Sequence, residues 1–294
     1  QALLFLLLLL LLLSFLFSCC FAWRMLVRRL LASNRAPLAF TVRSRLFASS
    51  KAMSVSEHLA VVQAAVKAAV VARAESLKVP EKQVRLVAVS KTKPVEALKE
   101  AYEAGHRHFG ENYVQELVDK APEMPEDVQW HFIGHLQGNK VSTLVKGCPR
   151  LACLETIDSE KLARAVDKAW KAAYPERKLR VMIQVNSSGE ETKNGVEPAD
   201  VAQLCGIIAK ECEGLELAGL MTIGAPDYSG CRTEDFDTLR RCRDEAAAVL
   251  GVDPTSLEMS MGMSSDYENA IREGSTSVRV GSSIFGSRVY ASKS

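Results

Sequence analysis

A lysine at the end of a predicted buried strand is well placed for covalent chemistry. The segment 84–92 reads VRLVAVSKT, an apolar and β-branched run that ends at Lys91. Side chains alternate between the two faces of a strand, so Lys91 shares the face of Val87 and Val89. If that face is partly desolvated, the neutral and nucleophilic amine is favoured, and it can form a Schiff base with a carbonyl-bearing cofactor. The alternative is a solvated lysine, which we expect for Lys93.

An arginine and a Gly-Ser turn form a second group of candidate residues near the C-terminus. Arg279 lies between two valines inside a predicted strand, where it either contacts a covering helix or faces inward towards a ligand heteroatom. Gly281 and Ser282 follow directly, and Ser260 ends the preceding predicted strand. Glycine allows close approach to the backbone, and the N–H groups at a helix start favour an anion. The turn is therefore a candidate phosphate site, with an ordinary Gly-Ser turn as the alternative.

These groups together fit one type of ligand. An amine, a guanidinium and an anion site match a molecule with an aldehyde, a ring heteroatom and a phosphate. Pyridoxal 5′-phosphate (PLP) has all three.

The elements that must position these residues alternate between strand and helix. An amphipathic helix at roughly 55–78 precedes them, with apolar residues close to a 3.6-residue period. Helices are expected near 94–104, 112–120, 138–146, 159–173, 198–212, 232–250 and 265–273. Strands are expected at 84–89, 107–110, 128–133, 151–156, 179–185, 216–223, 256–261 and 277–280.

Eight such units predict an α/β protein with a single (β/α)8 barrel at 54–294 and an extra N-terminal helix. A doubly wound open sheet is the alternative, but it usually has a glycine-rich turn after its first strand, and SKTKP follows here. In a barrel the residues past the strand ends share one mouth. Lys91, Asn112, His131 and Met221 would reach that mouth together with the turn at 281–283.

Charge and cysteine content exclude several classes of function. Seven of the 37 basic residues lie within 1–52, which leaves 30 basic against 35 acidic residues, a net charge of about −5. A net acidic body argues against a nucleic-acid partner, because phosphates require a basic surface. The six cysteines beyond the first 52 residues show no zinc-ligand spacing, which predicts free thiols and no metal site.

The first 53 residues are predicted to be a leader outside the fold. Residues 2–17 are apolar except for Ser14, and 25–51 are rich in Arg and Ser and free of acidic residues, as in a transit peptide. Three interpretations remain open. Translation from Met25 would target a mitochondrion or plastid, the two parts could form a bipartite plastid signal, or Met53 could start a cytosolic form. No membrane span is expected in the mature body.

The chain resembles the pyridoxal phosphate homeostasis protein family, whose barrel is similar to the N-terminal barrel of alanine racemase. The resemblance extends from about Val84 to Tyr290. It is based on six motifs in order: VSKT (89–92), FGENYVQE (109–116), WHFIGHLQGNK (130–140), GLMTI (219–223), MSMGMSSD (259–266) and VRVGSSIFG (278–286).

The resemblance implies a role for each candidate residue. Lys91 would hold PLP as an internal aldimine, and Arg279 would face the pyridine nitrogen. Ser260, Gly281 and Ser282 would hold the phosphate, and Ser282 stands where the family often has Thr. Asn112 would lie near the ring and Met221 in the pocket wall. His131 joins the site under the resemblance, with a packed core histidine as the alternative.

Two classes of function are compatible with these residues and motifs. One is a non-catalytic carrier in vitamin B6 homeostasis, a monomer or weak dimer with PLP-dependent apo-enzymes as candidate recipients. The other is a barrel-type PLP enzyme, such as an amino-acid racemase or decarboxylase. Such enzymes add a β-rich domain, whereas this sequence ends four residues after Tyr290. We therefore expect no opposite-face acid–base group, which racemisation requires, and we favour the carrier.

Overall fold

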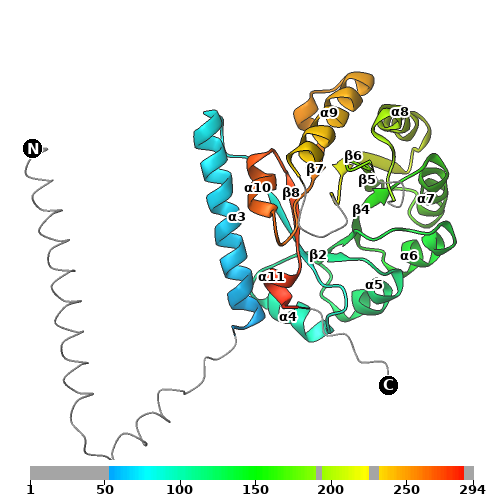
Figure 1. Cartoon of the computed structure of the whole chain (residues 1–294). Helices are drawn as coiled ribbons and strands as arrows, with labels where there is room; N and C mark the ends of the chain where they lie inside the picture. Colours follow the sequence, from blue (N-terminus) through cyan, green and yellow to red (C-terminus); the bar gives the residue numbers. More distant parts are fainter. Residues whose placement is uncertain (1–52, 190–193, 225–231, 288–294) are drawn as a thin grey trace, which may run out of the picture. The chain divides into compact units, whose positions relative to one another are not determined.

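The computed structural model describes residues 53–189, 194–224 and 232–287, and the leader predicted at 1–53 lies outside them except for Met53. Within this part, eight parallel strands pair in chain order and close into a barrel, which confirms the predicted fold (Figure 1). The strands are β1 (Arg85–Val89), β2 (His108–Glu111), β3 (Gln129–Phe132), β4 (Leu151–Ile157), β5 (Leu179–Gln184), β6 (Leu215–Met221), β7 (Glu258–Ser260) and β8 (Ser277–Val280).

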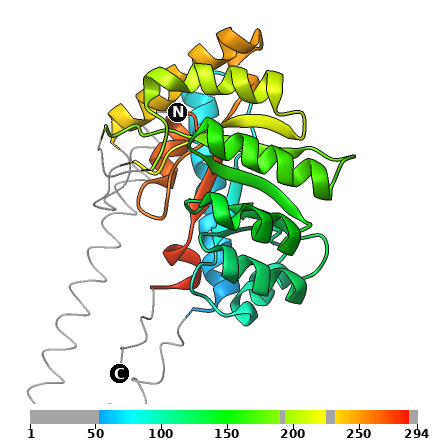
Figure 2. The same cartoon turned by 90° about the vertical axis from the view of Figure 1, so that its right-hand side faces the viewer.

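Helices connect the strands and cover the outside of the barrel, as the turned view shows for α5 to α9 (Figure 2). They are α4 (Val95–Glu103), α5 (Val114–Lys120), α6 (Val141–Gly147), α7 (Glu160–Ala173), α8 (Val201–Glu211), α9 (Thr233–Leu250) and α10 (Tyr267–Arg272). The 3₁₀ turns are η1 (Ala121–Glu123), η2 (Gly138–Lys140), η3 (Pro198–Asp200) and η4 (Pro254–Ser256). A short helix, α11 (Ser282–Phe285), follows β8 at the turn predicted to bind phosphate.

The additional N-terminal helix, α3 (Val55–Leu77), lies along α10 and α11 (Figure 1). It begins at a capping box, because Ser54 Oγ accepts the Glu57 N–H while Glu57 Oε2 accepts the Ser54 N–H. The helix is long and apolar enough to span a membrane by length and composition. Its residues Leu59, Val62 and Val66 are buried in the apolar core, so α3 serves here as a covering helix.

The strand predicted at 256–261 is shorter in the structure. η4 ends at Ser256, the first predicted position, and the Leu257 N–H donates back to the Pro254 carbonyl at 3.2 Å instead of joining the sheet. Gly262 has a φ of 98°, which ends the extended backbone after Ser260. The helices predicted at 138–146 and 198–212 likewise begin as the 3₁₀ turns η2 and η3.

The two faces of the strands differ sharply. Leu86 and Ala88 of β1 belong to the apolar layer under the helices. Val87 lies on the opposite face, next to Gly110 of β2, where an added Cβ would lie only 2.9 Å from Val87 Cγ1. The interior face of the other strands carries buried polar side chains as well as a small apolar cluster, and this interior leads to the candidate site.

Candidate ligand-binding site at the barrel mouth

The turn after β1 places Lys91 at the C-terminal end of the barrel. Lys91 is half-buried, whereas Ser90 before it is fully buried and donates its backbone N–H to Gly110 O at 2.9 Å. Lys93 is likewise half-buried, and its Nζ donates to the Ser287 carbonyl at 2.8 Å. The two lysines thus share the same degree of burial, and the assignment of the cofactor to Lys91 stays a prediction.

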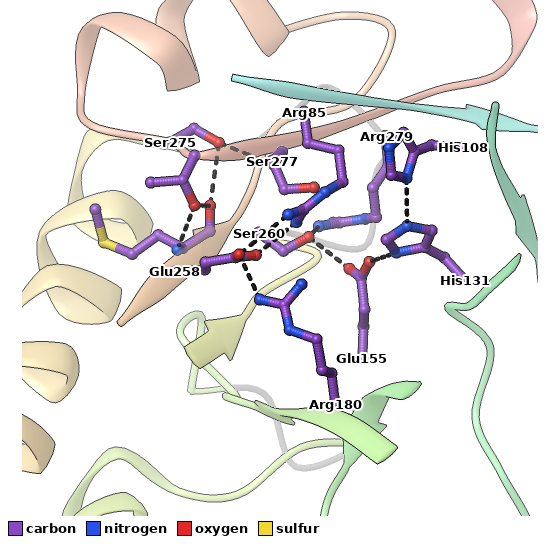
Figure 3. Close-up of polar contacts among 12 residues, drawn as sticks. Arg85, His108, His131, Glu155, Arg180, Glu258, Ser260, Ser275, Ser277 and Arg279 are labelled. Carbon is purple, nitrogen blue, oxygen red and sulfur yellow. Dashed lines mark hydrogen bonds and ion pairs between the residues drawn. The ribbon is translucent and has the colours of Figure 1, made fainter. Parts of the chain in front are cut away.

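Arg279 points into the barrel and not towards a covering helix. It is only 4% exposed, and its Nη1 donates to Ser260 Oγ at 2.6 Å (Figure 3). Its Nη2 donates to the Thr222 carbonyl at 2.7 Å. A guanidinium has five N–H donors, so three have no acceptor among the described residues and are available to a ligand.

A buried chain of hydrogen bonds continues from Ser260 to His131. Ser260 Oγ donates to Glu155 Oε2 at 2.6 Å, and Glu155 Oε1 lies 2.7 Å from His131 Nδ1 (Figure 3). Burial acts to raise the pKa of Glu155, but His131, Arg279 and Ser260 together hold that pKa below its usual value. His131 is 1% exposed and its Nε2 lies 3.1 Å from His108 Nδ1, so it occupies a packed core position.

Sequence reasoning missed Glu155 as a member of this chain. The available signal was an acidic residue inside the apolar strand predicted at 151–156. Cys153 of the same strand also lies nearby: His131, Cys153 and Glu155 offer ligand atoms within 4.8 Å of one another. A metal ion there would have to displace the hydrogen bond between His131 and Glu155, and burial raises the pKa of the Cys153 thiol, which opposes the thiolate that a metal needs.

The turn predicted to bind phosphate opens α11. The backbone N–H of Gly281 donates to Ser264 Oγ at 3.2 Å. The N–H groups of Ser282 and Ser283, in the first turn of α11, have no acceptor in the described ranges, and the Ser282 side chain is exposed. By contrast, the Ser260 hydroxyl already donates its proton to Glu155. Sequence reasoning did not select Ser264, which this hydrogen bond places beside the turn.

Asn112 and Met221 supply further parts of the candidate site. Asn112 follows β2, and its Oδ1 is buried with no hydrogen-bond partner among the described residues. Met221 ends β6 in register with Ser260, and it packs in a small inner cluster with Cys153, Met182 and Ala218. Both predicted residues therefore lie where strands end, but their contact with a ligand stays a prediction.

A second polar layer fills the barrel beyond this network, on the side of the strand starts. Glu258 Oε2 lies 2.6 Å from Arg85 Nη1, and its Oε1 lies 2.6 Å from Arg180 Nη2 (Figure 3). Burial acts to raise the pKa of Glu258, but the two arginines have the larger effect, so this pKa lies below its usual value. Paired charges therefore fill this end of the interior, where the Ser277 hydroxyl is also buried without a hydrogen-bond partner among the described residues.

The fold and site define a class of barrel proteins related to alanine racemase. Residues 48–289 match the family described as "Alanine racemase, N-terminal domain". An alanine racemase from Corynebacterium glutamicum shares the fold at a TM-score of 0.55 and 14% identity, and the match covers 78% of this chain and 62% of the racemase.

Within that class, the chain belongs to the pyridoxal phosphate homeostasis protein family. It is 48% identical over 253 residues to the Bos taurus pyridoxal phosphate homeostasis protein, covering 83% of this chain and 91% of that protein. The Schizosaccharomyces pombe protein of the same name is 52% identical over 209 residues, covering 70% of this chain and 85% of the relative. PipY of Synechococcus elongatus, solved with PLP bound, has a TM-score of 0.62 and 32% identity, and the match covers 79% of this chain and all of PipY.

Proposed function

We propose that this protein binds pyridoxal 5′-phosphate through Lys91 and acts in vitamin B6 homeostasis by holding and releasing the cofactor. The observation that carries the proposal is the placement of Lys91 at the end of β1, in the same barrel mouth as inward-facing Arg279 and the α11 turn. When bound, PLP supplies an aldehyde that condenses reversibly with a primary amine and releases one water molecule.

The described residues fit that cofactor. The unused N–H groups of Ser282 and Ser283, with the Ser264 hydroxyl beside Gly281, are suited to a phosphate. Arg279 has donors available for a ring nitrogen. The buried Asn112 Oδ1 without a partner is an acceptor that a ligand could satisfy.

Arg279 argues against PLP chemistry that needs a protonated ring, but it does not exclude a racemase. A guanidinium keeps its charge, so Arg279 beside a pyridine nitrogen would disfavour protonation of that nitrogen and weaken the ring as an electron sink. Racemases share such an arginine, so a barrel-type racemase or decarboxylase is the competing function. We propose that turnover is absent, and that PLP-dependent apo-enzymes receive the cofactor.

One experiment with the purified PLP-loaded protein tests both parts. Lys91→Ala should abolish the borohydride-trapped adduct, while the matched Lys93→Ala should retain it, because Lys93 is bonded to Ser287. Retention of the adduct in Lys91→Ala would contradict the assignment of the lysine. Racemisation or decarboxylation of amino acids at about 1 s⁻¹ or faster, an ordinary enzyme rate, would contradict the carrier.

The compartment is a separate proposal, since residues 1–52 lie outside the described residues. We propose a mitochondrial or plastid protein if translation starts at Met25 or includes the upstream segment, and a cytosolic one if it starts at Met53. Mass spectrometry of the mature N-terminus distinguishes these cases.

A further inference from the structure

A buried lysine on α5 contacts the turn that carries Lys91. Lys120 Nζ donates to the Ser90 carbonyl at 3.0 Å, to Glu111 Oε1 at 2.8 Å and to Glu116 Oε2 at 2.8 Å. An ammonium has three N–H donors, so each donor of Lys120 has an acceptor. Lys120 is therefore fixed in one place.

The same two carboxylates hold the residues on either side of Lys91. Glu111 Oε1 accepts the Ser90 hydroxyl at 2.7 Å, on the N-terminal side of Lys91. Glu116 Oε2 accepts the backbone N–H of Thr92 at 2.8 Å, on the C-terminal side. Both neighbours of Lys91 are thus tied through carboxylates to the Lys120 ammonium.

The backbone at this turn needs such support. Thr92 has a φ of 61°, and a β-branched residue rarely adopts the left-handed region unless the surrounding structure imposes it. Among the described residues other than glycine, only Lys78, at the end of α3, also has a positive φ. Glu111 also depends on Lys120, because burial raises the pKa of Glu111 and the nearby ammonium opposes that rise.

We propose that Lys120 is a positioning residue for Lys91: through the Ser90 carbonyl, Glu111 and Glu116, it holds the backbone that aims the Lys91 amine at the cofactor aldehyde. The inference rests on the proposed function. All three Lys120 donors are bonded within the protein, so its loss should impair formation of the covalent bond more than non-covalent docking of the phosphate and ring.

Two probes separate these effects in the full-length protein. PLP requires the Lys91 amine for its covalent bond, whereas 4′-deoxypyridoxine 5′-phosphate carries a methyl group in place of the aldehyde and can only dock. In Lys120→Met the rate of borohydride-trapped adduct formation with PLP should fall roughly 10- to 100-fold, the cost of a misplaced reacting group. Its affinity for the deoxy probe should match that of the wild type. Lys99→Met, at an exposed position on α4, is the control and should change neither.

The outcomes are distinct. Adduct formation at the wild-type rate in Lys120→Met, or equal loss of affinity for both probes, overturns the proposal. Because removal of a buried charge can unfold the barrel, Glu116→Gln is the second variant: Glu116 is half-buried, and weakening its bond to Thr92 should slow adduct formation roughly 2- to 10-fold. An unchanged rate of adduct formation in Glu116→Gln also overturns the proposal. A wild-type protein that forms no adduct at all contradicts the proposed function instead.

Discussion

Arg279 joins the ligand-binding mouth to the polar interior of the barrel. Its guanidinium bonds Ser260, whose hydroxyl in turn bonds Glu155, so one residue contacts the interior chain and retains donors for a ligand. Sequence patterning could place Arg279 in a strand but gave no preference between the inner and outer faces. The deciding information is strand register, which sets Arg279 opposite Val87 of β1.

Replacement of this arginine tests its role in ligand binding. Arg279→Gln should weaken PLP binding roughly 10- to 100-fold, because a hydrogen bond to a charged group contributes about 1.5–3 kcal/mol. Equilibrium dialysis with the apo-protein measures the change. Arg164→Gln on α7 is the control, since the pairs of Arg164 with Glu160 and Glu211 are exposed and such pairs contribute little. Equal PLP affinity in the two variants would show that Arg279 does not contact the cofactor.

At the scale of elements, close backbone contact brings the ends of neighbouring strands together at the mouth. Gly134 follows β3, and a Cβ at this position would overlap the carbonyl oxygen of Asn112 after β2. Only glycine lets the two backbones approach this closely. The position of Asn112 therefore depends on a residue that has no side chain.

Gly134→Ala should consequently lower the free energy of unfolding by about 1–3 kcal/mol, the usual cost of overpacking a buried site. Urea unfolding followed by circular dichroism measures this change. The matched control is Gly138→Ala, because an added Cβ at Gly138 meets no atom within 4 Å. If the two variants unfold at the same urea concentration, the backbones after β2 and β3 can separate without cost.

The order and approximate bounds of the elements could be predicted from sequence, and the polar network could not. Apolar periodicity and helix-start signals depend on neighbours along the chain; the Ser159 hydroxyl, for example, caps α7 by accepting the Leu162 N–H. Glu155 and Lys120, by contrast, form hydrogen bonds with residues that lie on other strands and turns. Nothing in a single segment indicates that Lys120 is buried on an otherwise amphipathic helix.

At the scale of the whole molecule, the barrel interior encloses ionisable groups whose protonation is linked to folding. Burial, followed by the charge of His131, lowers the pKa of His108 to about 3, and burial also lowers the pKa of His106. Both histidines are therefore held neutral in the folded barrel. An unfolded chain would let them titrate near the ordinary histidine pKa of about 6.5.

This linkage predicts that the barrel loses stability as the pH falls below about 6.5. Between about pH 6.5 and pH 3, His108 is protonated in the unfolded chain but stays neutral in the folded barrel. Its contribution to the free energy of unfolding is therefore complete above about pH 6.5 and declines as the pH falls towards about 3. Thermal unfolding at pH 7.5, 6.5 and 5.5 should show a falling Tm, and His108→Asn should reduce the fall between 6.5 and 5.5. Lys99→Met, at an exposed position on α4, should retain the wild-type slope. A slope that His108→Asn leaves unchanged would mean that water reaches the interior of the barrel and that His108 titrates there as freely as in the unfolded chain.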